Sequence, residues 1–327
     1  MPITLGEAAK LEQSPLKRGF ILALLRYSPL LNRVPFVDSP GLRINGNRWQ
    51  TLPTVGFRKV NGAYTESTGT VEEVQETLAL LGGDVFVDRI FTKAPGYAQN
   101  PLQVQMQMKA KAVAFQFNDS FINGDLASNA DSFNGLKQRV TNMPARQTID
   151  LSSAGDSLKV LASSANEHTF VDAIHQAVKY CDGATDVLCN EATYLGLGQV
   201  ARRLNLFQVI QDALGKKWES MSSGSEMVNF VDVGLKGDKS TEIITSTEDP
   251  GDGGNDSSSI YVVRMDSSDG LHGLQIAGLG MDIYDPTKGG EDPTAPRLIR
   301  RIDWATGLRN LSNYCIVRIK GFKMAAA

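Results

Sequence analysis

Two histidines and an aspartate are the first residues whose spacing suggests chemistry. His168, Asp172 and His175 are four and three residues apart, so on a helix they would lie on one face. Two imidazoles and a carboxylate at that spacing could hold a divalent transition metal. The same segment also has an apolar face, and a solvated polar face opposite an apolar one is the more common arrangement. We therefore favour an ordinary amphipathic helix and expect no metal here.

Two glycine-rich segments resemble nucleotide-binding patterns. Gly196 and Gly198 fit G-x-G-x-x-A, in which the second glycine lets a pyrophosphate approach the start of a helix. Here, however, both glycines fall inside a helical pattern. The segment from Gly234 to Thr241 resembles a phosphate loop, but Asp238 stands where that pattern needs glycine. We expect no nucleotide at either place and predict no cofactor.

One acidic loop and the cysteines complete the search for chemistry. Four loop residues could ligate calcium, although their spacing departs from that of an EF-hand: Asp249, Asp252, Asn255 and Asp256. The composition of this loop favours an exposed, solvated segment. The three cysteines form no C-x-x-C pair, which argues against disulfides and a zinc site: Cys181, Cys189 and Cys315. No catalytic group emerges, so an enzyme is not expected.

Composition and charge exclude further classes. The chain has 327 residues, is 42% hydrophobic and carries a formal net charge of -3 with both signs interspersed. A broad basic surface for nucleic acid is therefore not expected. The apolar run from Gly19 to Leu25 is far shorter than the roughly 20 residues of a membrane span. We expect a protein made in the cytoplasm of its cell, with no membrane partner.

A long hairpin is the clearest element that the core cannot absorb. Residues 52–66 read LPTVGFRKVNGAYTE, and Asn61-Gly62 at the centre predicts a tight turn. The limbs would run from Arg43 to Val60 and from Ala63 to Leu80, with Gly82-Gly83 marking the base. Large apolar residues are sparse in both limbs. Such a hairpin would expose its edges unless another surface covered them.

A long amphipathic helix is predicted over residues 101–123. Asn100-Pro101 is a favourable start, and Asn123-Gly124 a favourable end. Apolar residues recur every three or four positions and predict one buried stripe: Leu102, Met106, Ala110, Val113, Phe117 and Phe121. Before it, residues 84–91 alternate as a strand does.

The second half of the chain has an α/β texture. Helices are predicted over residues 170–181 and 191–204, and strands over 186–190, 230–233, 242–245, 259–265, 298–304 and 315–319. Loops are predicted over 249–259 and 285–296. The helices, strands and hairpin together indicate an α+β protein.

The order of these elements resembles the major capsid proteins of tailed bacteriophages, which have the Hong Kong 97 fold. The matching stretches include RVPFVDSPG, the hairpin, GGDVFVDRIF, the helix NPLQVQMQMKAKAVAFQFNDSFINGD, FNGLKQRV, DVLCNEAT and the closing strands. The resemblance implies an N-terminal arm (1–40), an extended hairpin loop (41–80), a peripheral domain with a long spine helix (81–150), an axial domain (151–296), and peripheral closing strands (297–327).

This resemblance implies a structural protein of the virion. Subunits would assemble in the host cytoplasm, through pentamers and hexamers, into an icosahedral-type head enclosing double-stranded DNA. Expected partners are other copies of the chain, a separate scaffolding protein, the portal, and decoration or tail-connector proteins. The packaged DNA would be held by non-specific proximity. Two alternatives stay open: an encapsulin-like nanocompartment with the same fold, and a nucleotide-dependent α/β enzyme using Gly196 and Gly198.

The resemblance also assigns the hairpin to contacts between subunits. We expect these residues to contact a neighbouring subunit: Leu52, Phe57, Arg58, Lys59, Asn61 and Tyr64. Some relatives join subunits by a Lys–Asn isopeptide bond, and Lys59 with Asn310 or Asn313 offers the residue types. We favour non-covalent contacts here.

Overall fold

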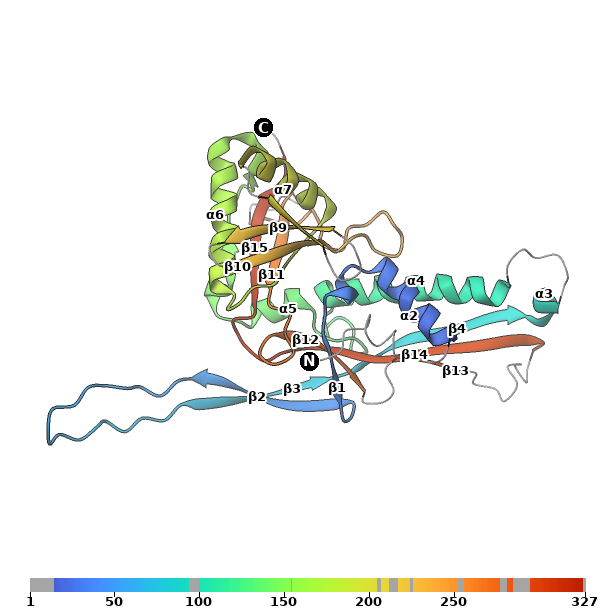
Figure 1. Ribbon diagram of the computed structural model, residues 1–327, viewed down its shortest axis with the longest axis horizontal. Coiled ribbons are helices and arrows are strands. Elements are labelled where there is room, and N and C mark those ends of the chain that lie inside the picture. Colours follow the sequence, from blue (N-terminus) through green and yellow to red (C-terminus); the bar gives the residue numbers. More distant parts are fainter. Residues whose placement is uncertain are drawn as a thin grey trace.

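The protein forms two packed regions and a hairpin that projects from them (Figure 1). A computed structural model describes residues 15–93, 100–153, 155–204, 207–211, 217–223, 226–251, 254, 256–276, 281–284 and 295–325. Each region contains a mixed β-sheet covered by helices, which confirms the predicted α+β class.

The first region is a five-stranded sheet organised around one long strand. Its strands are β1 (Phe36–Ser39), β12 (Leu271–Ile276), β14 (Arg297–Asn310), β13 (Met281–Tyr284) and β4 (Ala79–Asp88). Strand β4 pairs antiparallel with β14 along one edge, while β12 and β13 share the other edge. Helix α4 (Pro101–Asn123) lies along this sheet, and α2 (Pro15–Tyr27) packs on α4.

Helix α4 begins and ends where the sequence predicts. The Asn100 side chain accepts a hydrogen bond from the Leu102 backbone N–H at 3.0 Å, and Pro101 occupies the first turn. At the other end Gly124 has a φ of -54°, so no left-handed residue closes the helix. Glycine is needed there for space, because an added Cβ would lie 2.3 Å from the carbonyl oxygen of Phe133.

The apolar stripe of α4 forms the centre of the first core. Val113, Phe117 and Phe121 are at most 3% exposed, as the sequence predicts. The Phe117 ring stacks on Trp304 of β14 with centroids 5.1 Å apart, and Phe36 of β1 lies 5.6 Å from the same indole. Helix and sheet are thus joined by aromatic packing.

The paired glycines before the predicted strand do not mark a boundary. Gly82 and Gly83 lie within β4, opposite Asp303 and Ile302 of β14. An added Cβ at Gly82 would lie 1.9 Å from the Ile302 carbonyl oxygen, and Gly83 has a φ of 149°. The glycines therefore allow two backbones to approach closely within a sheet rather than ending one.

The second region contains an eight-stranded sheet with two helices beside it. The sheet order is β5 (Thr148–Asp150), β15 (Ile316–Lys323), β11 (Ser258–Val263), β7 (Asp186–Cys189), β10 (Glu226–Asp232), β9 (Lys217–Ser223) and β8 (Phe207–Gln211), with β6 (Leu158–Lys159) also on β15. Helix α6 (Ser164–Tyr180) packs on β15 and α7 (Glu191–Leu204) on β10. The predicted helices and the strand at 186–190 are confirmed.

The two closing strands, which the resemblance assigns to one domain, lie in different sheets. Strand β14 belongs to the first sheet and β15 to the second. The chain therefore passes from one sheet to the other between Asn310 and Ile316. Alternation identifies both segments as strands, but it carries no information about which sheet receives each one.

Smaller differences concern element ends. The strand expected over 84–91 ends at Asp88, and α3 (Arg89–Lys93) follows. Residues 242–245 do not form the predicted strand; Glu242 makes only an isolated bridge with Leu235. The remaining short elements are η1 (Leu30–Asn32), α5 (Leu136–Thr141), η2 (Ala145–Gln147) and η3 (Val160–Ala162). Most of the predicted loop at 285–296 lies outside the described residues.

Candidate assembly surface

The proximal half of the hairpin is an antiparallel ladder whose register shifts once, between Trp49 and Thr51. Strands β2 (Arg43–Thr51) and β3 (Thr70–Thr77) pair from Arg43 opposite Thr77 to Thr51 opposite Thr70. Arg48 and Glu72 form a cross-strand ion pair at 2.8 Å. Opposite charges in register of this kind stabilise a two-stranded ribbon that has no sheet behind it.

The distal half is not a ladder, so the predicted limbs are too long. Residues 52–69 are all described, and none of them belongs to a strand. Pro53 offers no backbone N–H, and Gly69 lies so close that an added Cβ would be 3.1 Å from its ring. The second limb also ends early, because Ala79 and Leu80 belong to β4.

The tip turns one residue earlier than predicted. The Gly62 backbone N–H donates to the Lys59 carbonyl at 3.0 Å, so the central residues are Val60 and Asn61. Asn61 has a φ of 65°, a conformation that asparagine tolerates better than most residues. The Arg58 guanidinium donates to the Gly62 carbonyl at 3.2 Å and steadies the turn from one side.

The predicted contact residues are all exposed within the subunit. Leu52 is 73% exposed, Tyr64 69%, and Phe57 110%, so the Phe57 side chain is fully exposed to solvent. Arg58, Lys59 and Asn61 are exposed as well. The structure brings two of the six together, because the Arg58 guanidinium lies 5.0 Å from the centre of the Tyr64 ring.

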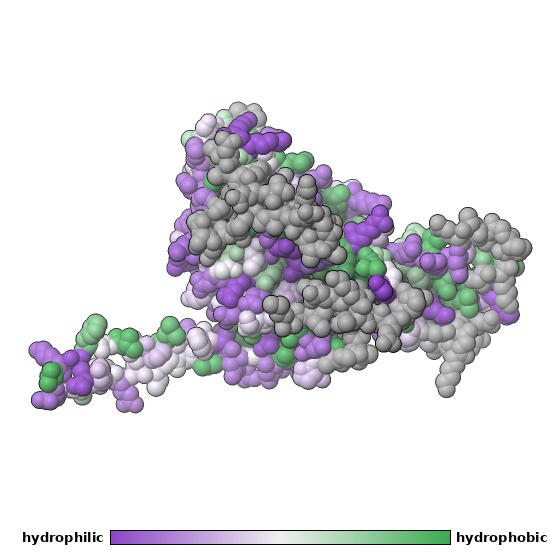
Figure 2. Space-filling view, in the orientation of Figure 1, coloured by the Kyte–Doolittle hydropathy of each residue, from purple (hydrophilic) through white to green (hydrophobic). Residues whose placement is uncertain are grey.

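Sequence reasoning missed several exposed apolar residues in the same hairpin. They are Trp49, Val55, Val60 and Val71, each at least 60% exposed. Trp49 and Val71 face each other across the ladder and form an apolar pair near the middle of the hairpin. Figure 2 shows apolar residues along the projecting arm. The sequence contained one signal for this pair. Each limb carries a large apolar residue, and the strand register places the two residues opposite one another.

The candidates for covalent joining differ in accessibility. Lys59 is exposed at the tip, whereas Asn310 is 5% exposed. The Asn310 side-chain oxygen accepts a hydrogen bond from Arg139 at 2.6 Å, and its amide donates to the Ser312 carbonyl at 3.2 Å. Asn310 is thus engaged within its own subunit, whereas Asn313, the other candidate, is half-buried. Non-covalent contacts stay our prediction.

The nucleotide-like segments lack the geometry that nucleotide binding requires. Gly196 and Gly198 lie inside α7, where an added Cβ at Gly196 would be 2.7 Å from the Met324 sulfur. This glycine gives space for helix packing. The Asp238 carboxylate accepts hydrogen bonds from the backbone N–H groups of Ser240 and Thr241 at 3.1 and 3.0 Å. A phosphate would need those same donors.

The metal candidates that the structure describes do not form a group of ligands. His168 and Asp172 lie exposed on α6, opposite the buried Phe170 and Ile174. The Asp256 carboxylate accepts a hydrogen bond from Lys323, whereas Asp252 and Asn255 of the calcium candidate lie outside the described residues. Within the described ranges, no three His, Cys, Asp or Glu side chains are grouped to hold a metal ion.

The cysteines are all buried. All three are free thiols: Cys181, Cys189 and Cys315. Burial raises the pKa of the Cys315 thiol to about 12 and also raises that of Cys189. They pack as small apolar residues, as the sequence suggests.

No helix in the described part of the chain is long and apolar enough to span a membrane.

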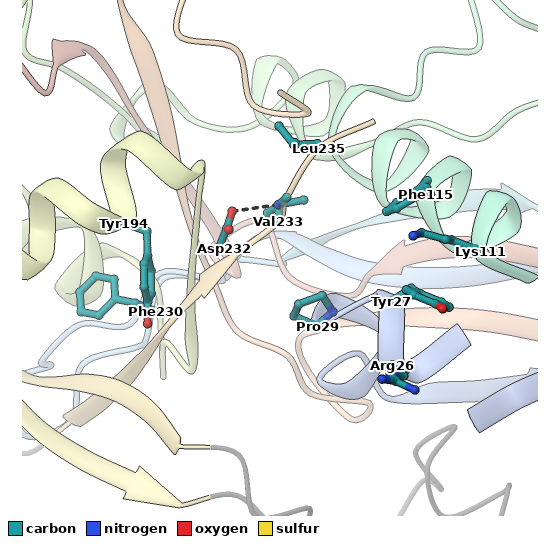
Figure 3. A pocket seen from close by; sticks show the side chains of 11 residues that line it. Arg26, Tyr27, Pro29, Lys111, Phe115, Tyr194, Phe230, Asp232, Val233 and Leu235 are labelled. Carbon is teal, nitrogen blue, oxygen red and sulfur yellow. Dashed lines mark hydrogen bonds between the residues drawn. The ribbon is translucent and has the colours of Figure 1, made fainter. Parts of the chain in front are cut away.

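A cavity of about 520 Å³ lies between the two regions (Figure 3). The Lys111 ammonium on one wall sits 4.5 Å from the centre of the Tyr27 ring. On the opposite wall the Asp232 carboxylate accepts a hydrogen bond from the Gly234 backbone N–H at 2.9 Å, and burial raises its pKa. Lys111 and Asp232 thus both have neighbours within the subunit.

One family model and several solved structures are similar to this chain. A family model described as "Major capsid protein GP7" matches residues 28–164. No curated protein matches the chain. Among solved structures, the SrpI encapsulin of Synechococcus elongatus PCC 7942 is 12% identical, with a TM-score of 0.59 over 90% of this chain and 88% of that one.

Two further structures are similar over nearly the whole chain. The capsid of a native GTA particle is 15% identical, with a TM-score of 0.58 and coverage of 92% of this chain and 90% of that one. A structure from Mycobacterium phage Bobi is 12% identical, with a TM-score of 0.55 and coverage of 91% and 89%. At these identities the likeness is one of fold.

Proposed function

We propose that this chain, which is a major capsid protein with the Hong Kong 97 fold, forms the pentamers and hexamers of an icosahedral-type phage head enclosing double-stranded DNA. The observation that carries the proposal is the hairpin, which projects from both packed regions with apolar side chains that the subunit leaves uncovered. In a head-to-tail ring each hairpin would lie on the next subunit. Such contacts close by rotation into rings.

The contact would be centred on the distal hairpin. Leu52, Phe57 and Tyr64 supply apolar area, and Arg58, Lys59 and Asn61 supply polar groups around the tip. A two-stranded ribbon with open edges is an aggregation hazard for a free subunit, and burial against a specific neighbour removes the hazard. Trp49 and Val71 extend this surface toward the body.

The two packed regions would correspond to the peripheral and axial domains of the fold. In this proposal the peripheral domain holds β4, α4 and β14, and the axial domain holds the second sheet, including β15. The role is structural rather than catalytic. It requires no cofactor, because the work lies in contacts distributed over many subunits.

Other partners follow from a role in the virion. A separate scaffolding protein would guide curvature, a portal would occupy one vertex, and decoration or tail-connector proteins would bind the finished shell. Assembly would take place in the host cytoplasm. DNA inside the shell would lie near the protein without sequence-specific contacts, in keeping with a net charge of only -3.

An encapsulin-like compartment is the second candidate, because an encapsulin is among the most similar structures. Both candidates predict closed shells, so their contents separate them. Particles from infected or induced cells that carry nuclease-protected double-stranded DNA support the phage head. Particles that carry a packaged protein and no DNA support the compartment.

Removing the hairpin tests the assembly role. Replacing residues 46–71 by a short linker retains Glu76 at the hairpin base and both cores. We expect subunits with an unchanged melting temperature that form no closed shells in electron micrographs. Normal shells from this variant would refute the proposal, and so would a wild-type shell whose hairpin folds back on its own subunit.

The manner of joining has its own test. Because Asn310 is engaged by Arg139 and Ser312, we expect no bond from Lys59 to it. Mature particles boiled in detergent should run as a single monomer band. A ladder of covalent oligomers that disappears in a Lys59→Arg variant would contradict this expectation.

A further inference from the structure

The base of the hairpin is held by one buried arginine. Arg139 lies in α5, and its side chain is 7% exposed. Its Nη1 and Nη2 donate to the two carboxylate oxygens of Glu76 in β3, at 2.6 and 2.9 Å. This is a bidentate pair, in which both the distance and the plane of the two groups are fixed.

The same guanidinium also reaches the body. Its Nε donates to the Asn134 carbonyl at 2.8 Å, Nη1 donates to the Asn310 side-chain oxygen at 2.6 Å, and Nη2 donates to the Leu308 carbonyl at 2.7 Å. All five donors of the guanidinium are therefore used. One side chain ties the hairpin to α5 and to the end of β14.

A second arginine lies on the same face of the hairpin. Gly46 leaves room for Arg309, whose Nη2 would be 1.9 Å from an added Cβ. Burial lowers the pKa of Arg309, and Glu76 acts in the opposite direction. Glu76 is thus the carboxylate that compensates two cations where the hairpin leaves the body.

The apolar cluster at the base of the hairpin is small, and its packing is less directional than the hydrogen bonds of Arg139. Leu78, Leu274 and Ala305 form a separate cluster, with Ile44 of β2 packed against it. Apolar contact stabilises the base, but it fixes no direction because the hydrophobic effect is non-directional. The two hydrogen bonds from Arg139 to Glu76 are directional, and the other three hold the guanidinium to the body, so together they constrain the angle.

A small change in the angle at the base produces a large displacement at the tip of the hairpin. From Glu76 to the tip the limb has about 14 residues, so it reaches roughly 46 Å at about 3.3 Å per residue. A rotation of about 10° at the base would move the tip by roughly 8 Å, more than the length of two residues. A hairpin that must reach a specific site on a neighbour therefore needs a fixed direction at its base.

We propose that Arg139 is a positioning residue that fixes the direction in which the hairpin leaves the body, and through it the size at which shells close. The link to shell size rests on the proposed function, whereas the direction of the hairpin is a property of the single subunit. Lysine at this position would supply three donors from one point and could not reproduce the planar pair with Glu76.

The test measures the hairpin direction in free subunits. Spin labels are placed at Gln50→Cys, at the outer end of the paired part of the hairpin, and at Ala145→Cys on the body, since the three native cysteines are buried. Glu76→Gln and Arg139→Lys should lose the single narrow distance distribution of the parent protein. Asp84→Asn is the matched control, because it removes a bidentate pair with Arg301 at 2.6 and 2.7 Å that lies within the first sheet. It should keep the narrow distribution.

A double variant covers the possibility that an unpaired buried charge prevents folding. Arg139→Met with Glu76→Leu removes both buried charges together, and Arg309, which also loses Glu76, is only half-buried and keeps access to water. It should fold, lose the narrow distribution, and give shells of mixed diameter in electron micrographs. A narrow distribution in this variant, or equal broadening in Asp84→Asn, would overturn the proposal.

Shell measurements separate the two levels of the inference. Broad distances in free subunits together with shells of one diameter would overturn the link to shell size. Wild-type protein that never forms shells would instead refute the proposed function. The distance measurement would still decide whether Arg139 sets the direction of the hairpin.

Discussion

Helix α4 and the hairpin use apolar residues in opposite ways. In α4 the Phe117 side chain is fully buried, and its ring stacks on Trp304. In the distal hairpin Phe57 is 110% exposed, and residues 52–69 lack even strand pairing. The helix is stabilised within the subunit, whereas the hairpin is supported at its base and along its proximal ladder alone.

The difference separates residues that specify the fold from residues left for assembly. Burying a phenylalanine stabilises a protein by about 1.5–3 kcal/mol relative to leaving it exposed. Burial of Phe117 contributes that free energy to the folding of the subunit. Burial of Phe57 would contribute it to the proposed contact with a neighbouring subunit. The same residue type therefore has two different consequences in one chain, and paired substitutions can measure each of them.

The largest expected difference is between Phe117→Ala and Phe57→Ala. The first removes a fully buried ring and should lower the free energy of unfolding by about 3–5 kcal/mol. The second should change it by less than about 0.5 kcal/mol, because the ring is fully exposed within the subunit. Urea unfolding of free subunits measures both. Equal losses would mean that the hairpin packs on its own body in solution.

A smaller difference is expected between two glycines. At Gly82 an added Cβ would lie 1.9 Å from the Ile302 carbonyl oxygen, so Gly82→Ala must separate β4 from β14. We expect a loss of about 1–3 kcal/mol in the free energy of unfolding. At Gly56 an added Cβ meets nothing within 4 Å, and Gly56→Ala should leave the melting temperature unchanged. A stable Gly82→Ala variant would show that the two strands tolerate separation.

The smallest difference concerns two ion pairs and their response to acid. Burial opposes ionisation of Glu248, but Arg318, Ser259 and Lys137 together lower its pKa below the ordinary 4.5. A lowered pKa means that the ionised carboxylate stabilises the fold above pH 4.5, and that this stabilisation is lost as the pH falls through the lower, folded value.

Glu248→Gln should therefore cost about 1 kcal/mol near neutral pH and flatten the acid limb of the stability curve. The control is Glu72→Gln, which removes the hairpin pair with Arg48. Its effect should be smaller because Glu72 is 39% exposed. Melting temperatures measured between pH 3 and 7 test this, and parallel curves for Glu248→Gln and wild type would contradict it.

Local signals made α4 predictable. Asn100, Pro101 and a stripe of evenly spaced apolar residues all lie within one segment, so its bounds follow from the sequence. The hairpin was predictable as an element, but not the point where its ladder ends. That point depends on Pro53 lying beside Gly69, a contact between the two limbs that single-strand patterns do not describe.

Long-range pairing set the limit of prediction. Nothing in the alternation of residues 315–323 indicates that β15 pairs with β11 rather than continuing the sheet of β14. For the same reason the exposed pair of Trp49 and Val71 was missed, because it exists only once the register of β2 and β3 is known. The exposure of Leu52, Phe57 and Tyr64 was anticipated, and their contact with a neighbour stays a prediction.

The pairing of β4 with β14 also limits when the first sheet of a new subunit can form. Asp84 and Arg301, which pair across these strands, are 217 residues apart in the chain. At a synthesis rate of about 5–20 residues per second, β4 leaves the ribosome roughly ten to forty seconds before its partner. Contacts so distant in sequence also make folding slow. The hairpin is therefore complete early in synthesis, well before the rest of its own subunit exists, and its open edges need protection during that interval.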